Sequence, residues 1–156
     1  TKLADAFNMR VLISERVDSP KVRQGRVSFA DVISQSDILS LHCPQTLDNE
    51  NLINASVLTQ MKPTAMLINT ARGALVNSVD LLSALKNKQI AYAALDVLEQ
   101  EPPPSNHPLL NAKLANLKIT AHIAWASSEA QQRLIDLLSK NISAFQNKES
   151  LNRLDI

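Results

Sequence analysis

Short apolar runs that each stop at a polar or charged residue recur along this chain. Each run has four or five residues, a length typical of a buried strand rather than of a helix. We therefore predict one strand for each run. The predicted strands are Arg10–Ser14, Ile38–Leu41, Ala65–Asn69, Ala91–Leu95 and Leu117–Thr120.

Helical patterns alternate with these strands. Residues that commonly cap helices precede them, as where Ser28 is followed by Asp31 and Asn77 by Asp80. Such alternation predicts an α/β fold, a doubly wound, Rossmann-like parallel sheet with helices on both faces. Helices are expected after Ser28, Asn54 and Asn77 and from Ser128, and Thr1–Phe7 is expected to be the end of a further helix.

Polar residues stand where the predicted strands end. The carboxyl ends of parallel strands meet at one edge of a sheet, and open α/β sheets bind their ligands at that edge. We interpret the third run, Ala65–Asn69, as a buried strand whose carboxyl end places Arg72 in a cleft. The residues expected along this edge are Glu15, His42–Pro44, Thr70–Gly73, Asp96 and His122.

Composition narrows the classes of partner. The 156-residue chain has a formal net charge of +1 and no long run of Lys or Arg, so neither nucleic acid nor an anionic membrane is expected. No stretch approaches the roughly 20 apolar residues of a membrane span, and no signal peptide is recognisable. We expect a cytoplasmic protein with a single core and a small-molecule or protein partner.

Neither a disulfide nor a metal site is predicted. Cys43 is the only cysteine, which excludes an intrachain disulfide. The spacing of His42, Cys43 and His122 fits no zinc pattern. His107, in the proline-rich loop, has no evident partner in the sequence.

Four segments in the same order resemble the NAD-binding domain of the D-isomer-specific 2-hydroxyacid dehydrogenases. They are Leu41–Thr46, Leu67–Gly73, Ala94–Pro102 and Ile119–Ser127. The last of them looks most like the glycerate dehydrogenase (hydroxypyruvate reductase) branch. The resemblance runs from about Val11 to the C-terminus and implies NAD-dependent hydride transfer between a 2-oxo acid and a D-2-hydroxy acid. Hydroxypyruvate and glyoxylate are the expected substrates.

The resemblance also implies roles for particular residues. The expected catalytic residues are Arg72, Glu101 and His122, with Arg72 holding the substrate carboxylate and His122, beside Glu101, donating the proton. Glu15 is expected on the adenosine ribose, which favours NAD over NADP, although Arg16 beside it opposes that preference. The residues expected to bind cofactor are Glu15, Arg16, Cys43, Pro44, Thr70, Ala71, Arg72, Asp96, His122 and Ala124.

Structural alternatives stay open for several of these residues. Arg72 could be a surface residue that closes a strand, and Asp96 could cap the following turn. Glu15 could pair with the adjacent Arg16. Glu101 could belong to a merely solvated loop, since Glu99 lies two residues earlier. Trp125 could cover the active site or fill an interface.

The chain departs from the family pattern at three places. Ala121 stands where the family usually has Pro, and Ala124 and Trp125 stand where it often has Gly. The third departure bears on completeness, because no G-x-G-x-x-G turn occurs in the chain. We therefore expect the C-terminal portion of an NAD-binding domain, without its first strand and Gly-rich turn and inactive by itself. A sheet lacking its central strand should show a gap or borrow a strand. The tail from about 147 to 156 is expected to pack toward a separate substrate domain.

A second hypothesis belongs to a different class. The same domain occurs in NAD(H)-sensing proteins that resemble the C-terminal-binding-protein corepressors, in which the cofactor would stabilise a dimer that recruits partners. A homodimer is expected under either hypothesis. Turnover with NADH and hydroxypyruvate separates the two classes, because a sensor binds the cofactor with slow or no turnover.

Overall fold

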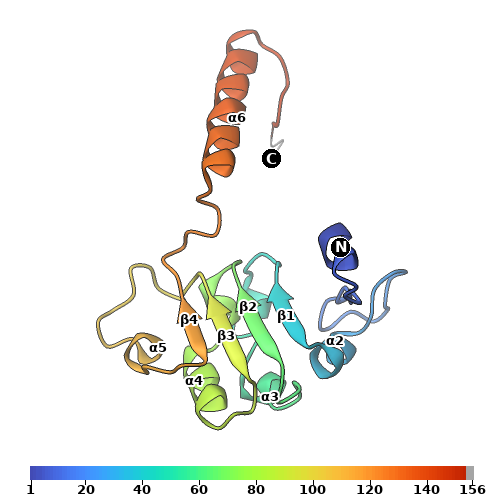
Figure 1. Cartoon of the computed structure of the whole chain (residues 1–156). Coiled ribbons are helices and arrows are strands. Elements are labelled where there is room, and N and C mark those ends of the chain that lie inside the picture. The colour runs from blue at the N-terminus through green and yellow to red at the C-terminus, as the bar shows by residue number, and fades with distance from the viewer. Residues whose placement is uncertain (154–156) are drawn as a thin grey trace. The chain divides into compact units, whose positions relative to one another are not determined.

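The computed structural model describes residues 1–153. The chain divides into two compact units, Thr1–Ala121 and a second unit that begins at His122. Each unit is described by itself below. The first unit contains the sheet and the core, and the second contains one long helix (Figure 1).

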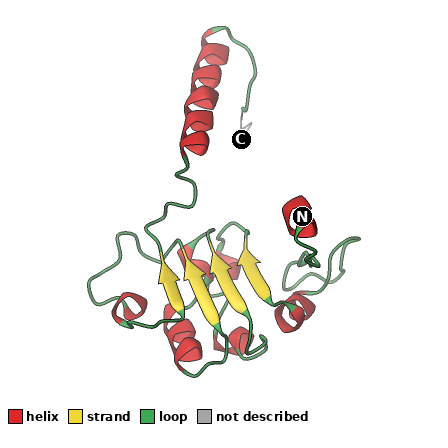
Figure 2. Cartoon of the chain, viewed as in Figure 1, coloured by secondary structure: helices red, strands yellow, loops and turns green. Residues whose placement is uncertain are grey.

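A four-stranded parallel sheet forms the centre of the first unit (Figure 2). Its strands lie in chain order, so that β1 and β4 are the edge strands. The prediction of an α/β fold built on a parallel sheet is confirmed. The strands are β1 (Ile38–Leu41), β2 (Met66–Asn69), β3 (Tyr92–Leu95) and β4 (Leu117–Ile119).

The predicted first strand, Arg10–Ser14, was wrong. A strand needs a ladder of hydrogen bonds to a neighbour, and this segment has only an isolated bridge between Ser14 and Val27. Two backbone hydrogen bonds hold it, from the N–H of Glu15 to Val27 and from the N–H of Val27 to Ile13. The segment therefore lies outside the sheet.

The connections between the strands cover one face of the sheet. The strands follow chain order, so crossovers of one hand place every connecting helix on the same side. Helix α4 contacts both α3 and α5. The connecting elements are η1 (Leu47–Asn49), α3 (Ala55–Leu58), η2 (Gly73–Leu75), α4 (Ser78–Lys86) and α5 (Pro108–Asn111).

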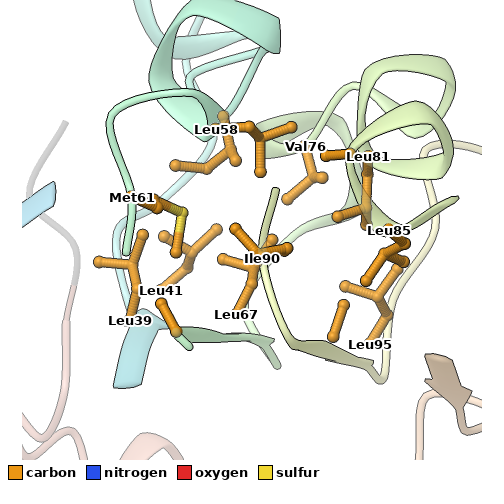
Figure 3. Packing of buried hydrophobic residues seen from close by; sticks show 14 of the residues in the cluster. Leu39, Leu41, Leu58, Met61, Leu67, Val76, Leu81, Leu85, Ile90 and Leu95 are labelled. Atoms are coloured by element: carbon orange, nitrogen blue, oxygen red, sulfur yellow. The ribbon is translucent and has the colours of Figure 1, made fainter. Parts of the chain in front are cut away.

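Burial along the strands agrees with this one-sided cover. In β1, Leu39 and Leu41 are buried, whereas Ile38 and Ser40 are exposed. The buried strand residues pack against apolar residues from the connecting segments (Figure 3). The core contains two sets of residues. The strands contribute Leu39, Leu41, Leu67 and Leu95, and the connections contribute Leu58, Met61, Val76, Leu81, Leu85 and Ile90.

Side-chain caps define where the helices begin. Ser28 accepts a hydrogen bond from the N–H of Asp31 at the start of α2 (Phe29–Gln35). Asn54 and Asn77 cap α3 and α4 in the same way, as predicted. Thr1–Phe7 contains the short helix α1 (Lys2–Ala6), also as predicted, with no side-chain cap.

The second unit is dominated by α6 (Ser128–Gln146). Its cap is Ser127, which accepts from the N–H of Ala130, one residue before the predicted Ser128. Among the residues that the structure describes, no helix has the length and apolar character that crossing a membrane requires. Residues 154–156 of the predicted packing tail lie outside the described residues. Five apolar residues at helical spacing form an exposed apolar stripe on α6: Leu134, Leu137, Leu138, Ile142 and Phe145.

Candidate active site

The register of the sheet brings four strand ends to one edge. Leu41 pairs with Asn69, and Asn69 pairs with Leu95. Leu95 in turn pairs with Ile119. The residues that directly follow are therefore neighbours along the carboxyl edge, where ligands bind in open α/β sheets. They are His42, Thr70, Asp96 and Thr120.

The side chain of Asn69 shapes the turn that carries Arg72. Asn69 is completely buried. Its Nδ2 donates to the carbonyl of Arg72 at 2.9 Å, and its Oδ1 accepts from the N–H of Ala71 at 3.0 Å. Arg72 is exposed, and its Nη1 donates to the carbonyl of Ala71 at 2.6 Å. The buried amide thus fixes the backbone from which the guanidinium projects.

Gly73 allows a close backbone approach directly after Arg72. A Cβ atom at Gly73 would lie 1.8 Å from the carbonyl carbon of Leu98 and 2.3 Å from the nitrogen of Glu99. These are main-chain atoms that cannot rotate away. Only glycine permits the Arg72 turn to pack against the segment that follows β3.

An open cleft of about 850 Å³ lies beside Arg72. Its size is within the range of roughly 300–1,000 Å³ that is typical of small-molecule sites. Four residues of the predicted site, Cys43, Pro44, Ala71 and Arg72, line it together. The remaining lining residues are His42, Gln45, Thr46, Leu47 and Glu50.

Asp96 is buried at the end of β3. Its Oδ1 accepts a hydrogen bond from the hydroxyl of Thr120, which follows β4. Its N–H donates to the carbonyl of Asn69 at 2.9 Å. Asp96 therefore ties the ends of β3 and β4 together at the ligand-binding edge.

The loop after β3 carries two glutamates with different surroundings. Glu101 is exposed, and its Oε1 accepts from the N–H of Leu98 at 2.9 Å. Glu99 accepts from the hydroxyl of Ser78 at 2.7 Å, and its Oε1 lies 3.2 Å from Nε2 of the buried His107. Partial burial works against ionisation of Glu99, but hydrogen bonds from Ser78 and its own backbone N–H, together with the contact to His107, lower the pKa of Glu99.

Glu15 is buried and organises the loop that follows it. Its carboxylate accepts from Nε and Nη2 of Arg23 at 2.7 and 2.6 Å. The backbone N–H groups of Arg16 and Arg23 donate to it as well. The Arg23 guanidinium, followed by the Arg16 N–H, holds the pKa of Glu15 far below its usual range. The partner of Glu15 is therefore Arg23, eight residues away, and not the side chain of Arg16.

His122 opens the second unit with a backbone in the left-handed region, at φ 53°. Its carbonyl accepts from Nε1 of Trp125 at 2.9 Å, which closes a tight turn that also contains Ala124. Histidine is one of the side chains that adopt this conformation more often than most. The indole of Trp125 is thus fastened to the backbone of His122.

Several residues that contact the candidate site residues were not predicted from the sequence. Arg23 gave no local signal, because its contact with Glu15 depends on the path of the intervening loop. Ser78 and His107 were likewise not connected with Glu99. Asn69 could have been recognised, since Asn at a strand end favours a side-chain-closed turn. Within residues 1–153, no cluster of three or more His, Cys, Asp or Glu side chains could hold a metal ion.

Residues 1–124 match the family described as D-isomer specific 2-hydroxyacid dehydrogenase, NAD binding domain. The chain belongs to this family. The glycerate dehydrogenase of Methylorubrum extorquens is 45% identical over 144 residues, covering 92% of this chain and 45% of that protein. The glyoxylate reductase of Thermofilum pendens is 44% identical over 149 residues, covering 92% and 43%.

Solved structures of other proteins share the fold of this chain. The D-lactate dehydrogenase of Lactobacillus jensenii with NAD⁺ matches with a TM-score of 0.86 and 29% identity, covering 99% of this chain and 50% of that one. An acyclic imino acid reductase in complex with NADPH and D-Arg matches with a TM-score of 0.83 and 33% identity, covering 98% and 48%. The chain spans about half the length of the curated relatives that it matches.

Proposed function

We propose that the natural full-length protein reduces a 2-oxo acid to a D-2-hydroxy acid with NADH, and that hydroxypyruvate or glyoxylate is its substrate. One observation carries this proposal. Arg72, Ala71 and Pro44 line a single cleft at the carboxyl edge of a parallel sheet. Relatives named glycerate dehydrogenase and glyoxylate reductase support the choice of substrate.

Arg72 binds the substrate carboxylate in this proposal. It is exposed at the cleft, and its backbone is held by the buried Asn69. The planar guanidinium can form two parallel charge-assisted hydrogen bonds to a carboxylate, which Lys cannot reproduce. Binding there orients the neighbouring keto group relative to the cofactor.

His122 donates the proton to the ketone oxygen, and Glu101 orients and stabilises the imidazolium. Histidine is suited to this step because it can carry a transferable proton near neutral pH. A carboxylate beside the ring favours its charged form. The left-handed backbone of His122 agrees with a functional role, since such conformations gather at active sites.

The residues at the sheet edge fit a nicotinamide dinucleotide, which supplies the hydride when bound. Pro44 forms a wall that has no N–H, Thr70 and Ala71 offer backbone groups, and Asp96 is ionisable at the edge. Glu15 supports NAD over NADP through its fixed negative charge. Its four hydrogen bonds from Arg16 and Arg23 weaken that support.

The test is steady-state turnover of the natural full-length polypeptide. We expect NADH oxidation with hydroxypyruvate and glyoxylate, a D-configured product by chiral chromatography, and weaker binding of NADPH than of NADH by calorimetry. NADH binding without turnover of any 2-oxo acid would instead support the corepressor-like sensor. Sedimentation with and without NAD tests the predicted homodimer, and fractionation of cells tests the predicted cytoplasmic location.

A further inference from the structure

The carboxylate proposed to assist proton transfer sits on an exposed loop. Glu101 is followed by three prolines, and its Oε1 accepts a hydrogen bond from the N–H of Leu98 within the same loop. A general acid works efficiently only when its partners stay within hydrogen-bonding reach. A misplacement of about 1 Å can reduce a rate roughly 100-fold. The loop therefore needs attachment to rigid elements.

Glu99 provides such an attachment two residues before Glu101. Its Oε2 accepts from the hydroxyl of Ser78 at 2.7 Å, and its Oε1 lies 3.2 Å from Nε2 of His107. Ser78 is the first residue of α4 and is buried. His107 directly precedes α5, and its side chain is 3% exposed. One carboxylate thus joins the loop to two helices that pack on each other.

The backbone of the same segment is also fixed by close packing. The peptide between Leu98 and Glu99 packs against Gly73 so closely that no Cβ fits there. Gly73 directly follows Arg72. The base of the Glu101 loop is therefore held by main-chain packing at Gly73 and by side-chain contacts at Glu99. These two constraints relate the position of Glu101 to that of Arg72.

A solvated surface glutamate would not show this arrangement. The side chain of Glu99 is 40% exposed, yet both of its oxygens are directed at buried groups. His107 is a buried polar side chain, and burial of a polar group is costly unless a polar neighbour compensates for the lost water. Among the described residues, neither ring nitrogen of His107 has a partner in hydrogen-bond geometry, and Nε2 lies 3.2 Å from Oε1 of Glu99. The contact with Glu99 is therefore the polar contact that the His107 ring makes in the described chain.

We propose that Glu99 is a positioning residue: through its contacts with Ser78 and His107 it fixes the loop that carries Glu101. This inference rests on the proposed function for its effect on catalysis. The anchoring of the loop does not depend on that function. Glu99 itself touches neither substrate nor cofactor in this proposal.

The first test is amide hydrogen exchange at Leu98, whose N–H is protected by Glu101. We expect exchange to be roughly tenfold faster or more in Glu99→Ala, because local opening exposes this amide. Glu99→Gln should remain close to wild type, since its amide can still accept from Ser78 and donate to the imidazole. Gln100→Ala, an exposed neighbour in the same loop, is the matched control and should change nothing.

The second test is turnover in the natural full-length polypeptide. Glu99→Ala should lower kcat for 2-oxo acid reduction by about 10- to 100-fold while KM for NADH stays within about twofold. The midpoint of the pH–rate profile should move to lower pH, because a displaced Glu101 no longer favours the imidazolium. Glu99→Gln should restore most of kcat. If Glu99→Ala does not fold, Ser78→Ala should show the same effects at smaller size.

The outcomes separate the two proposals. If wild-type protein reduces no 2-oxo acid, the proposed function fails, and exchange at Leu98 alone decides whether Glu99 anchors the loop. If exchange at Leu98 is unchanged in Glu99→Ala, the positioning role is overturned whatever the turnover. A lower melting temperature with an unmoved pH profile and kcat would also overturn it, because that pattern describes a structural residue.

Discussion

At the scale of single residues, Arg72 and Glu15 differ in how far their charged groups are already engaged by other groups of the protein. Arg72 gains its position from a neutral buried amide, Asn69, and keeps its guanidinium exposed at the cleft. Glu15 is buried and its carboxylate is occupied by Arg23 and two backbone N–H groups. The Arg72 guanidinium is therefore accessible to a ligand at the cleft, whereas the Glu15 carboxylate would first have to break its contact with Arg23.

Replacement of Arg72 tests the proposed carboxylate site. We expect Arg72→Lys to reduce kcat/KM for the 2-oxo acid by roughly 100-fold, about 3 kcal/mol, because the two-pronged hydrogen bonding is lost. Arg72→Ala should be worse. Steady-state kinetics of the full-length polypeptide provides the measurement, with Arg133→Lys, at an exposed position on α6, as control. Activity of Arg72→Lys within twofold of wild type would remove Arg72 from the site.

The ion pair between Glu15 and Arg23 predicts a pH-dependent stability. Because the pKa of Glu15 is depressed in the folded chain, its contribution is present above the unfolded pKa of about 4.3 and is lost as the pH falls below that value. Arg23→Gln should therefore be less stable than wild type at pH 7, and the difference should shrink as the pH falls toward 3. Urea unfolding at a series of pH values measures this.

Arg26 offers a matched control for that experiment. Its Nη1 donates to the carbonyl of Ser14 at 2.7 Å, and a carbonyl does not titrate. Arg26→Gln should therefore change stability by an amount that is nearly independent of pH. A pH-independent difference for Arg23→Gln as well would show that Glu15 is not ionised against Arg23.

At the scale of elements, the turn after β2 and the loop after β3 behave as one assembly. Asn69 closes the turn, and Gly73 packs it against Leu98 and Glu99. Glu99 then joins the loop to α4 and α5. Two segments separated by more than 20 residues of sequence are thereby fixed in relation to each other.

Gly73→Ala tests this assembly. The added methyl group would overlap main-chain atoms of Leu98, so we expect a loss of about 3 kcal/mol in unfolding free energy and a marked loss of turnover. Gly25→Ala is the control. Gly25 has φ 77° and open space around its Cβ position, so only the backbone conformation opposes the change, at about 1 kcal/mol. Equal losses at both positions would contradict the close approach.

At the scale of the whole molecule, the core of the first unit is one-sided. The connecting helices cover one face of the sheet, and the alternate residues of β1, β2 and β3 are exposed or half-buried on the other face. A parallel sheet is usually covered on both faces. Within the described residues of each unit, the second face of the sheet and the exposed apolar stripe of α6 are thus surfaces at which further packing would bury apolar area.

Neighbouring residues of β2 test this one-sided core. Leu67 is completely buried, whereas Ile68 faces the opposite side and is half-buried. In this chain, Leu67→Ala should lower the unfolding free energy by about 2–5 kcal/mol, because it leaves a cavity. Ile68→Ala should lower it by about 1 kcal/mol, since less apolar area is withdrawn from water. Denaturant unfolding compares the two variants, and equal losses would show that both faces are covered.

The sequence by itself determined the features that depend on a few adjacent residues. Short apolar runs identified β1 to β4, and Ser28, Asn54 and Asn77 identified the helix starts, because strand pairing and capping depend on local chemistry. The strand ends placed Pro44, Arg72 and Asp96 at one edge. That step needed only the rule that parallel strands end together.

Tertiary structure alone decided the contacts between residues far apart in the chain. An apolar run such as Arg10–Ser14 has the local pattern of a strand, but without a ladder of bonds to a neighbour it remained outside the sheet. The pairing of Glu15 with Arg23 and of Glu99 with Ser78 and His107 likewise depends on how loops return. Local sequence patterns do not predict which distant residues a loop brings together, because the packing of the whole chain determines the path of the loop.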